Sequence, residues 1–307
     1  MIAVTGGAGF LGSHVCEELT LRGLDHAVIR SAAYDLRRQD SVEAFYREVS
    51  PRVVVHLAAT CGGIGANRAH PGRYFYDNAI MGLNLIEGAR VAEIDQFVLV
   101  GTVCAYPLNP PVPFVETDIW NGYPETTNAP YGVAKKSLFV MLDAYLREYG
   151  LRSSCLIPTN LYGERDNFDS RSSHVIPAMI RRFKTTPHGE RLQMWGTGVA
   201  TRDFLYAADA ARAIVTAVER GIGNALPINL GSGEDVSMRD LASRLAALCG
   251  HDTSLIDWDA SQPDGQPRRL LDTTRARDVL GWSPQVSLDE GLRRTVLWAE
   301  EAKPWRE

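Results

Sequence analysis

Near its start the chain reads Ile2-Ala3-Val4-Thr5-Gly6-Gly7-Ala8-Gly9-Phe10-Leu11-Gly12. The β-branched residues predict a short strand, Ile2–Thr5, and the apolar positions after the turn predict a helix that ends near Arg22-Gly23. Between strand and helix lies a Gly-x-x-Gly-x-x-Gly turn. Such glycines allow a tight turn and let the backbone approach a pyrophosphate, which then lies at the positive end of the helix. The turn therefore predicts binding of a dinucleotide.

Further along, apolar strands alternate with amphipathic helices. This alternation predicts an α/β fold with a Rossmann-type, doubly wound parallel sheet and right-handed crossovers. The expected strands are Ile2–Thr5, Ala27–Arg30, Val53–Ala59, Phe97–Val100 and Ser153–Ile157, and the expected helices between them include Ser41–Glu48, Tyr76–Val91 and Tyr131–Tyr149.

The alternation is lost in the second half of the chain, which begins with a polar segment, Asn167–Ser173. We expect residues 1–160 and about 203–222 to form the dinucleotide-binding Rossmann domain. Residues 161–202 and 223–307 would form a smaller, discontinuous C-terminal substrate domain over the carboxyl edge of the sheet. Its expected elements are a helix opening at His174, helices over Met238–Cys249 and Leu288–Glu301, a short strand at Ile228–Leu230, and an irregular basic loop at 263–269. A further helix, over about Asp209–Arg220, would belong to the Rossmann domain.

The composition of the 307 residues, 45% hydrophobic and 22% charged, is typical of a globular protein. A net charge of −5 gives no reason to expect nucleic acid or an anionic membrane as a partner. No apolar run approaches twenty residues, so we expect a cytoplasmic protein. The five cysteines are widely spaced without a Cys-x-x-Cys pair, and the seven histidines do not cluster, so neither a disulfide framework nor a metal site is expected.

Tyr131 and Lys135 are four residues apart, directly after Pro130, which is tolerated at the start of a helix. Their side chains therefore share one helical face. An ammonium beside a phenol favours the phenolate, so we expect the pKa of Tyr131 to lie below its free value of about 10. Such a pair could serve as acid and base for a carbonyl–alcohol reaction. By itself, the spacing also fits an ordinary surface helix.

The residue after the second strand usually meets the adenosine ribose and is acidic for NAD, with a basic neighbour for NADP. Here the basic Arg30 is followed by the uncharged Ser31-Ala32-Ala33, so this segment does not distinguish NAD from NADP. Asp35-Leu36 could lie along the adenine, or Asp35 could cap the following helix. The small residues that end Val53–Ala59 would let a cofactor pass closely.

These motifs together resemble the extended short-chain dehydrogenases/reductases, through Thr5-Gly6-x-x-Gly9-x-x-Gly12 and Tyr131-x-x-x-Lys135. Within them the chain is similar to the GDP-L-fucose synthases, which act on a GDP-4-keto-6-deoxyhexose. The similarity covers nearly the whole chain, in order. Its segments are Cys61–Ile64, Cys104–Pro107, Thr127–Tyr131, Pro158–Gly163, Asp166–Phe168, His174–Pro177, Trp195–Gly198 and Pro263–Asp272.

The resemblance implies five catalytic residues. Thr102 takes the place of a Ser that hydrogen-bonds the reacting oxygen, and both side chains carry a hydroxyl. Tyr131 would exchange a proton with that oxygen, while Lys135 would tune Tyr131 and contact the nicotinamide ribose. Cys104 and His174 match the family's acid/base pair at the carbons flanking the keto group. Taken alone, Cys104 could instead be a core thiol and His174 a helix cap.

The resemblance also implies two sets of binding residues. Arginine suits a pyrophosphate because its fork donates two hydrogen bonds at once, and Trp195 could cover the base or sugar, or pack in the core. The expected cofactor-binding residues are Gly6, Gly9, Phe10, Leu11, Gly12, Arg30, Asp35, Leu36, Leu57, Ala58, Ala59, Tyr131, Lys135, Pro158, Asn160 and Leu161. The expected substrate-binding residues are Asn160, His174, Val175, Arg182, Trp195, Arg202 and Arg269.

Two departures from the family pattern concern the cofactor. Where the family uses basic side chains to bind NADPH, this chain has Ala8 and Ala32, and only Arg30 remains. The cofactor is therefore NAD or NADP: the alanines slightly favour NAD, and the family precedent is NADP.

Three functions follow as alternatives. The first is a GDP-sugar epimerase/reductase that epimerises carbons beside a 4-keto group and transfers hydride. The second is a redox-neutral GDP-sugar epimerase that retains NAD and oxidises a sugar carbon transiently. The third is a catalytically silent sensor that binds a dinucleotide. The family also implies a homodimer packed through the helices Tyr76–Val91 and Tyr131–Tyr149.

Overall fold

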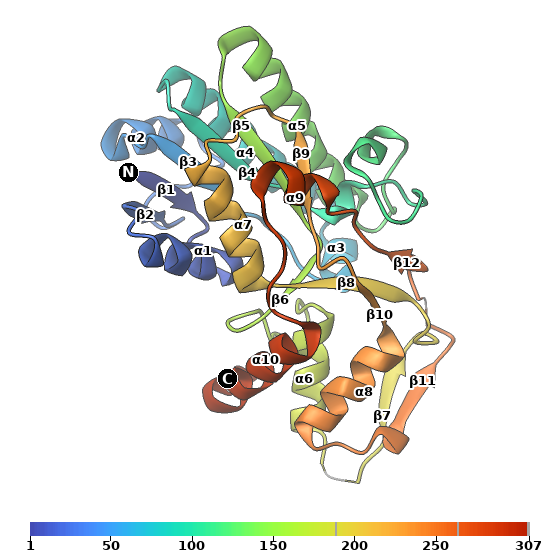
Figure 1. Ribbon diagram of the computed structural model, residues 1–307. Helices are drawn as coiled ribbons and strands as arrows, with labels where there is room; N and C mark the ends of the chain where they lie inside the picture. The colour runs from blue at the N-terminus through green and yellow to red at the C-terminus, as the bar shows by residue number, and fades with distance from the viewer. Residues whose placement is uncertain (188, 263, 306–307) are drawn as a thin grey trace.

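Six parallel strands form the main sheet, in the order β2-β1-β3-β4-β5-β9 (Figure 1). The computed structural model describes residues 1–187, 189–262 and 264–305. All neighbouring strands of this sheet run parallel, which confirms the predicted doubly wound α/β fold. The strands are β1 (Ile2–Thr5), β2 (His26–Ile29), β3 (Val53–His56), β4 (Gln96–Val100), β5 (Ser153–Pro158) and β9 (Pro227–Leu230).

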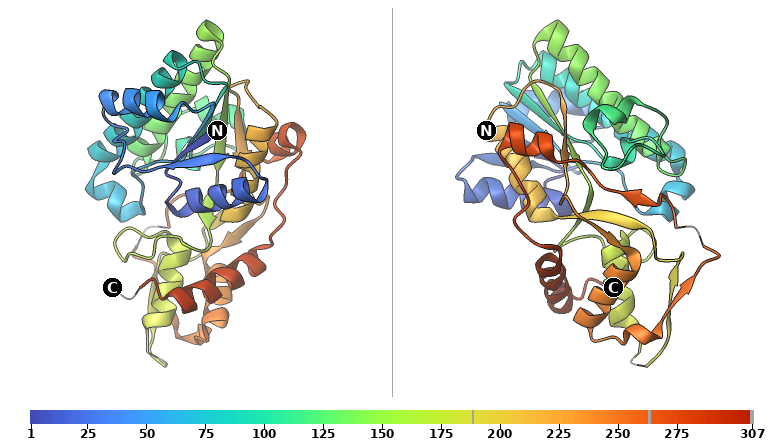
Figure 2. Two further views of the ribbon diagram at one scale, coloured as in Figure 1. Left: turned by 90° about the vertical axis from the view of Figure 1, so that its left-hand side faces the viewer. Right: turned by 45° about the vertical axis from the view of Figure 1, so that its right-hand side comes forward.

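Helices cover both faces of the sheet (Figures 1 and 2). Successive side chains of a strand point to opposite faces, so Ala3 packs into one buried cluster and Val4 into the other. This is why the strands read as continuous apolar runs. The first face carries α2 (Gln39–Val49), α4 (Pro71–Val91) and α5 (Ala129–Tyr149), and the second carries α1 (Phe10–Leu21), α7 (Ala207–Glu219) and α9 (Thr274–Leu280).

A second lobe lies beyond the sheet, with its own buried cluster that includes Tyr162, Ile180, Leu245 and Leu292 (Figure 2). One small sheet has the order β10-β8-β12, with β6 also pairing β8, and the other pairs β11 with β7. The elements of this lobe are β6 (Asn160–Tyr162), α6 (Val175–Thr185), β7 (Leu192–Trp195), β8 (Thr201–Tyr206), β10 (Asp235–Ser237), α8 (Met238–Cys249), η3 (Thr253–Leu255), β11 (Ile256–Asp259), β12 (Arg268–Arg269) and α10 (Leu288–Ala302).

The loops that follow β3 and β4 carry three short helices at the carboxyl edge of the sheet. These are α3 (Ile64–Ala69), η1 (Val103–Ala105) and η2 (Glu116–Trp120). The glycine-rich loop after β3 leads directly into α3, whose N-cap residue is Gly63.

Two boundaries differ from the expectation. The strand expected over Val53–Ala59 ends at His56, because its partner β1 ends opposite it at Thr5 and then turns into the glycine motif. The domain boundary near residue 222 placed residues 227–230 in the second domain, whereas β9 pairs with β5 as the sixth strand of the main sheet. β9 is only four residues long and pairs with a strand that lies much earlier in the sequence. Its own residues therefore do not indicate which sheet it joins.

Candidate active site

The glycine turn forms a close backbone cradle between β1 and α1. Gly6 has a φ of +73°, and a Cβ on Gly12 would lie 2.0 Å from the Gly6 carbonyl oxygen. The α1 N-cap is Gly9, without a side-chain cap, and the first turn holds no acidic residue. β1 lies between β2 and β3, where the strand order reverses, which is the usual dinucleotide site of such sheets. The uncapped N–H groups and the lack of side chains fit a pyrophosphate.

The adenosine end of the expected site lies after β2. Arg30, Ala8 and Ala32 are all exposed. Asp35 accepts two hydrogen bonds of 2.9 Å from the Arg37 guanidinium, and α2 is capped by Arg38, so Asp35 does not cap that helix. Leu36 is buried in the core of this face, unlike a side chain free to lie along an adenine.

The two segments that hold expected catalytic residues meet where α5 packs against η1. Lys135 is buried, and its Nζ donates a hydrogen bond of 3.2 Å to the Val100 carbonyl. Thr102 caps η1, with its hydroxyl accepting from the Cys104 N–H at 3.2 Å. A Cβ on Gly132 would lie only 2.2 Å from the Cys104 carbonyl oxygen, so this glycine lets α5 press against the segment of Thr102 and Cys104. The structure therefore places Tyr131, on the first turn of α5, beside these residues.

The pKa of Tyr131 differs from the expectation. Burial raises the pKa of the phenol well above its ordinary value, the charges of Cys61 and Cys104 act in the same direction, and the Thr102 hydroxyl opposes them. Burial also lowers the pKa of Lys135 to about 8. The expected lowering of the Tyr131 pKa was wrong for the protein without ligand, because desolvation penalises the phenolate. At neutral pH Tyr131 is consequently a protonated acid, the form that donates to a carbonyl oxygen.

The side chains of Cys104 and His174 are both partly accessible to solvent. Cys104 is partly buried rather than a core thiol. His174 is the N-cap residue of α6, yet its side chain makes no capping hydrogen bond and is 47% exposed. Its Nδ1 lies 3.7 Å from Asp166 Oδ1, and the interaction with Asp166 raises the pKa of His174, against the lowering effect of burial.

Sequence reasoning missed two residues of this site. Asp166 was known only as part of a matching segment. Cys61, in the glycine-rich loop, lies within electrostatic reach of Lys135, Asp166 and Cys104. The available signal was the position of the Cys61 loop directly after a strand of the parallel sheet, at the edge where ligands bind.

Two arginines of the second lobe lie side by side on paired strands, Arg202 on β8 and Arg269 on β12. Arg202 donates to the carbonyls of Gln266 at 2.6 Å and Asp264 at 3.2 Å, and Arg269 donates to the Gln266 side chain at 3.1 Å. Burial and the neighbouring Arg269 lower the pKa of Arg202 to about 10. The Asp264 carboxylate acts on Arg202 from a distance and raises its pKa, against the larger lowering effects of burial and Arg269. An anionic ligand would relieve the repulsion between the two guanidinium groups.

The remaining expected substrate-binding residues lie on several different elements of the second lobe. Trp195 is 72% exposed and does not pack in the core. The Arg182 guanidinium donates to the carbonyl of Gln193 on β7, and the Asn160 amide donates to the Asp203 carbonyl at 2.8 Å. Val175 begins α6 directly after His174.

The other expected cofactor residues lie at strand ends. Leu57, Ala58 and Ala59 follow β3, Pro158 ends β5 and is buried, and Leu161 packs against the core of the α1 face. Pro263, the first residue of the matching segment Pro263–Asp272, lies outside the described residues.

The comparisons with known proteins identify the family of the chain. Residues 2–231 match the model of the NAD dependent epimerase/dehydratase family. A probable GDP-L-fucose synthase 1 of Oryza sativa subsp. japonica is 36% identical over 98% of this chain and 92% of its own length. The GDP-L-fucose synthase of Escherichia coli K12 is 35% identical over 97% of this chain and 95% of its own.

Among solved structures, the UDP-glucose 4-epimerase of Thermotoga maritima with UDP-glucose superposes with a TM-score of 0.88 at 30% identity, covering 98% of this chain and 99% of that one. The motif-based resemblance to the extended short-chain dehydrogenases/reductases is thus confirmed. The chain belongs to the NAD dependent epimerase/dehydratase family.

Proposed function

We propose that this protein is a GDP-L-fucose synthase-like, NAD(P)-dependent GDP-sugar epimerase/reductase. It would epimerise the carbons beside a 4-keto group and transfer hydride. One observation carries the proposal: the protonated Tyr131, with Lys135 and Thr102, lies against the segment that holds Cys104. An acid for a carbonyl oxygen and a thiol for the neighbouring carbons thus share one site. The names and the 35–36% identity of its relatives support a GDP-linked sugar as the substrate.

The residues divide the chemistry into two proton-transfer tasks. A ketone acidifies the carbons beside it, so the Cys104 thiolate can remove a proton there while the electron pair moves to the carbonyl oxygen as an enolate. The His174 imidazolium then gives its proton to the opposite face of that carbon, and both groups return to their starting forms by exchange with water. In the second task Tyr131 gives its proton to the 4-oxygen. When bound in the glycine cradle, the nicotinamide supplies the hydride.

Binding of the nucleotide diphosphate would fall to Arg202 and Arg269. Their guanidinium groups lie together and repel each other, and guanidinium forks match phosphate oxygens. The exposed Trp195 ring, on the neighbouring β7, would stack on the base or sugar.

Denaturing the purified protein, without added cofactor, and identifying the released nucleotide by chromatography and mass tests the proposal. An empty site, with oxidation of added NADPH only when a GDP-4-keto sugar is present, supports the epimerase/reductase. It would also show that Arg30 suffices for the 2′-phosphate. Near-stoichiometric release of NAD would contradict net reduction.

That second outcome would support the redox-neutral epimerase. Two observations favour this alternative: Ala8 and Ala32 leave two positions near the adenosine without a positive charge, and a UDP-glucose 4-epimerase is among the similar structures. Both functions use Tyr131 and Lys135, and only the first requires fresh reduced cofactor at each turnover.

We also propose a homodimer that packs through α4 and α5. These two helices lie together and expose the apolar side chains of Phe75, Tyr76 and Leu83 on α4, with Val140 on α5. An Arg in place of Leu83 would bury its guanidinium in this apolar interface without a partner. We therefore expect Leu83→Arg to reduce the mass measured by light scattering from about twice 33.8 kDa to 33.8 kDa.

Leu21→Arg is the matched control, since Leu21 is exposed on α1 at the other face of the sheet. An unchanged dimer in Leu83→Arg, or equal effects of both substitutions, would contradict this interface.

A cytoplasmic location is part of the proposal. All five cysteines are free thiols, as expected in a reducing compartment. Over the described residues, none of the helices has both the length and the apolar character needed to cross a membrane.

A further inference from the structure

Asp166 presents an unusual carboxylate beside His174. Its side chain is only 2% exposed. Oδ1 accepts a hydrogen bond of 2.7 Å from the Asn167 N–H and lies 3.7 Å from His174 Nδ1. Oδ2 is buried and has no hydrogen-bond partner within the described ranges. A buried carboxylate with an unused oxygen is costly unless a donor or a positive charge lies next to it.

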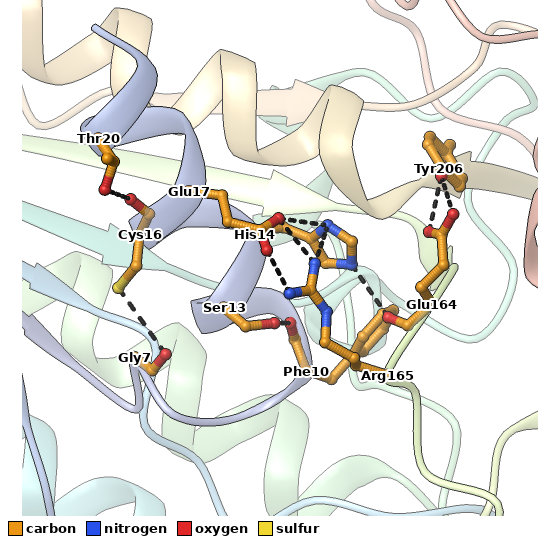
Figure 3. Close-up of polar contacts among 10 residues, drawn as sticks. All are labelled: Gly7, Phe10, Ser13, His14, Cys16, Glu17, Thr20, Glu164, Arg165 and Tyr206. Atoms are coloured by element: carbon orange, nitrogen blue, oxygen red, sulfur yellow. Dashed lines mark hydrogen bonds and ion pairs between the residues drawn. The ribbon is translucent and has the colours of Figure 1, made fainter. Parts of the chain in front are cut away.

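The chain before Asp166 is held by contacts with both lobes. Figure 3 shows that both oxygens of the Glu164 carboxylate accept from the Tyr206 hydroxyl at 2.6 Å, while His14 Nε2 on α1 donates to the Glu164 carbonyl at 3.0 Å. The Arg165 guanidinium pairs with Glu17, also on α1, and donates to His14 Nδ1 at 3.2 Å (Figure 3). The backbone of Arg165 is left-handed, with a φ of +66°, so the chain turns sharply just before Asp166.

The chain after Asp166 is also held in place. The Phe168 ring lies 6.0 Å from the ring of Trp298 on α10 and 6.2 Å from that of Trp305. The backbone at Asp166 is therefore held from both sides, and its carboxylate is further oriented by the hydrogen bond from the Asn167 N–H.

The cations nearest to this loop are engaged elsewhere. Arg171 pairs with Asp169 at 3.8 Å, and Arg181 on α6 donates to the Phe168 carbonyl at 3.4 Å. Of the other titratable groups around the site, Cys61 also lies within reach of the Asp166 charge. Asp166 is the charged group that acts on His174, and it raises the pKa of the imidazole 3.7 Å away.

We propose that Asp166 is the positioning residue of His174: it holds the imidazole through Nδ1 and so directs Nε2 towards the substrate. The distance of 3.7 Å is longer than a hydrogen bond. Catalytic hydrogen bonds are often long in ligand-free proteins and shorten when substrate is bound. The pairing stands on the geometry alone, and only its use in proton transfer rests on the proposed function.

The first test measures the pairing without any reaction. The Cε1 proton signal of His174, assigned by its loss in His174→Gln, is titrated by NMR in the unmutated protein, in Asp166→Asn and in Asp169→Asn. We expect a midpoint above 6.5 in the unmutated protein, a lower midpoint in Asp166→Asn, and no change in Asp169→Asn. Asparagine keeps the oxygen that accepts from Asn167, and Asp169 is a carboxylate of the same loop whose partners are Arg171 and Ser172.

A midpoint in the unmutated protein at or below 6.5 would overturn the proposal, and that result needs no variant to fold. An equal shift in both variants would overturn it too, because it would reflect the net charge of the loop rather than the Asp166 pairing.

The second test measures the use of the pair. The enzyme is incubated in D2O with a GDP-4-keto-6-deoxyhexose, and deuterium at the carbons flanking the ketone is followed by mass spectrometry. We expect Asp166→Asn to lower the maximal exchange rate about tenfold or more at nearly unchanged KM, with the greater loss at high pH, where the ring loses its proton sooner. Unchanged exchange would overturn the positioning role. Absence of exchange in the unmutated enzyme would contradict the proposed function instead, and the titration would still decide the pairing.

Discussion

Replacing Tyr131 with Phe is expected to lower the rate of hydride transfer about 10²- to 10⁴-fold. The substitution removes only the hydroxyl that would protonate the 4-oxygen and leaves the ring on the first turn of α5. Burial keeps this phenol protonated, and water cannot readily replace it in a desolvated site. Oxidation of NADPH in the presence of a GDP-4-keto sugar measures the loss, and deuterium exchange beside the ketone should persist because it uses Cys104 and His174.

Tyr149→Phe is the matched control, since it removes a hydroxyl from the exposed far end of the same helix. Both variants should unfold at the temperature of the unmutated protein. Full function of Tyr131→Phe in the cell would contradict the enzyme and favour the dinucleotide sensor, since such a sensor has no use for an acid at this position.

Replacing Gly12 with Ala is expected to reduce dinucleotide affinity at least about 100-fold and to destabilise the fold by about 1–3 kcal/mol. The added Cβ would lie 2.0 Å from the Gly6 carbonyl oxygen and 2.6 Å from the Gly7 Cα. Both atoms belong to backbone, so α1 must move away from β1, and the pyrophosphate cradle opens. Titration calorimetry with NAD and NADP on protein stripped of nucleotide, together with thermal unfolding, measures the two effects.

Gly72→Ala supplies the comparison, because a Cβ there meets no atom within 4 Å and the residue lies in the first turn of α4. It should leave affinity unchanged and stability equal or slightly higher. An affinity in Gly12→Ala equal to that of this control would mean that the dinucleotide does not bind at the glycine turn.

Much of the fold was predictable because its signals are local. The strand Ile2–Thr5 and the helix Met238–Cys249 have the expected bounds, since β-branched runs and a Ser cap with a glycine stop mark their ends. The two-residue strand β12 and the three-residue strands β6 and β10 escaped prediction because each exists only by pairing with β8.

The residue types of the site could be predicted from the sequence, but their burial and their charged neighbours could not. Tyr131 and Lys135 were located by their spacing, but the pKa direction of Tyr131 depends on burial by segments distant in sequence. Asp166 escaped attention for the same reason. Its significance comes from its burial beside His174, which no spacing within Asp166–Phe168 reveals.

The late position of β9 affects how the chain must fold as it is made. After β5 ends at Pro158, roughly 70 residues, including all of α6 and β8, are synthesised before β9 begins at Pro227. At about 5–20 residues per second, the ribosome leaves the outer edge of β5 unpaired for roughly 4–14 s. An unpaired apolar strand invites contact with other nascent chains. We therefore expect folding yield during translation to be limited by how well residues 159–226 shield that edge, and chaperones that bind exposed strands to matter most in this interval.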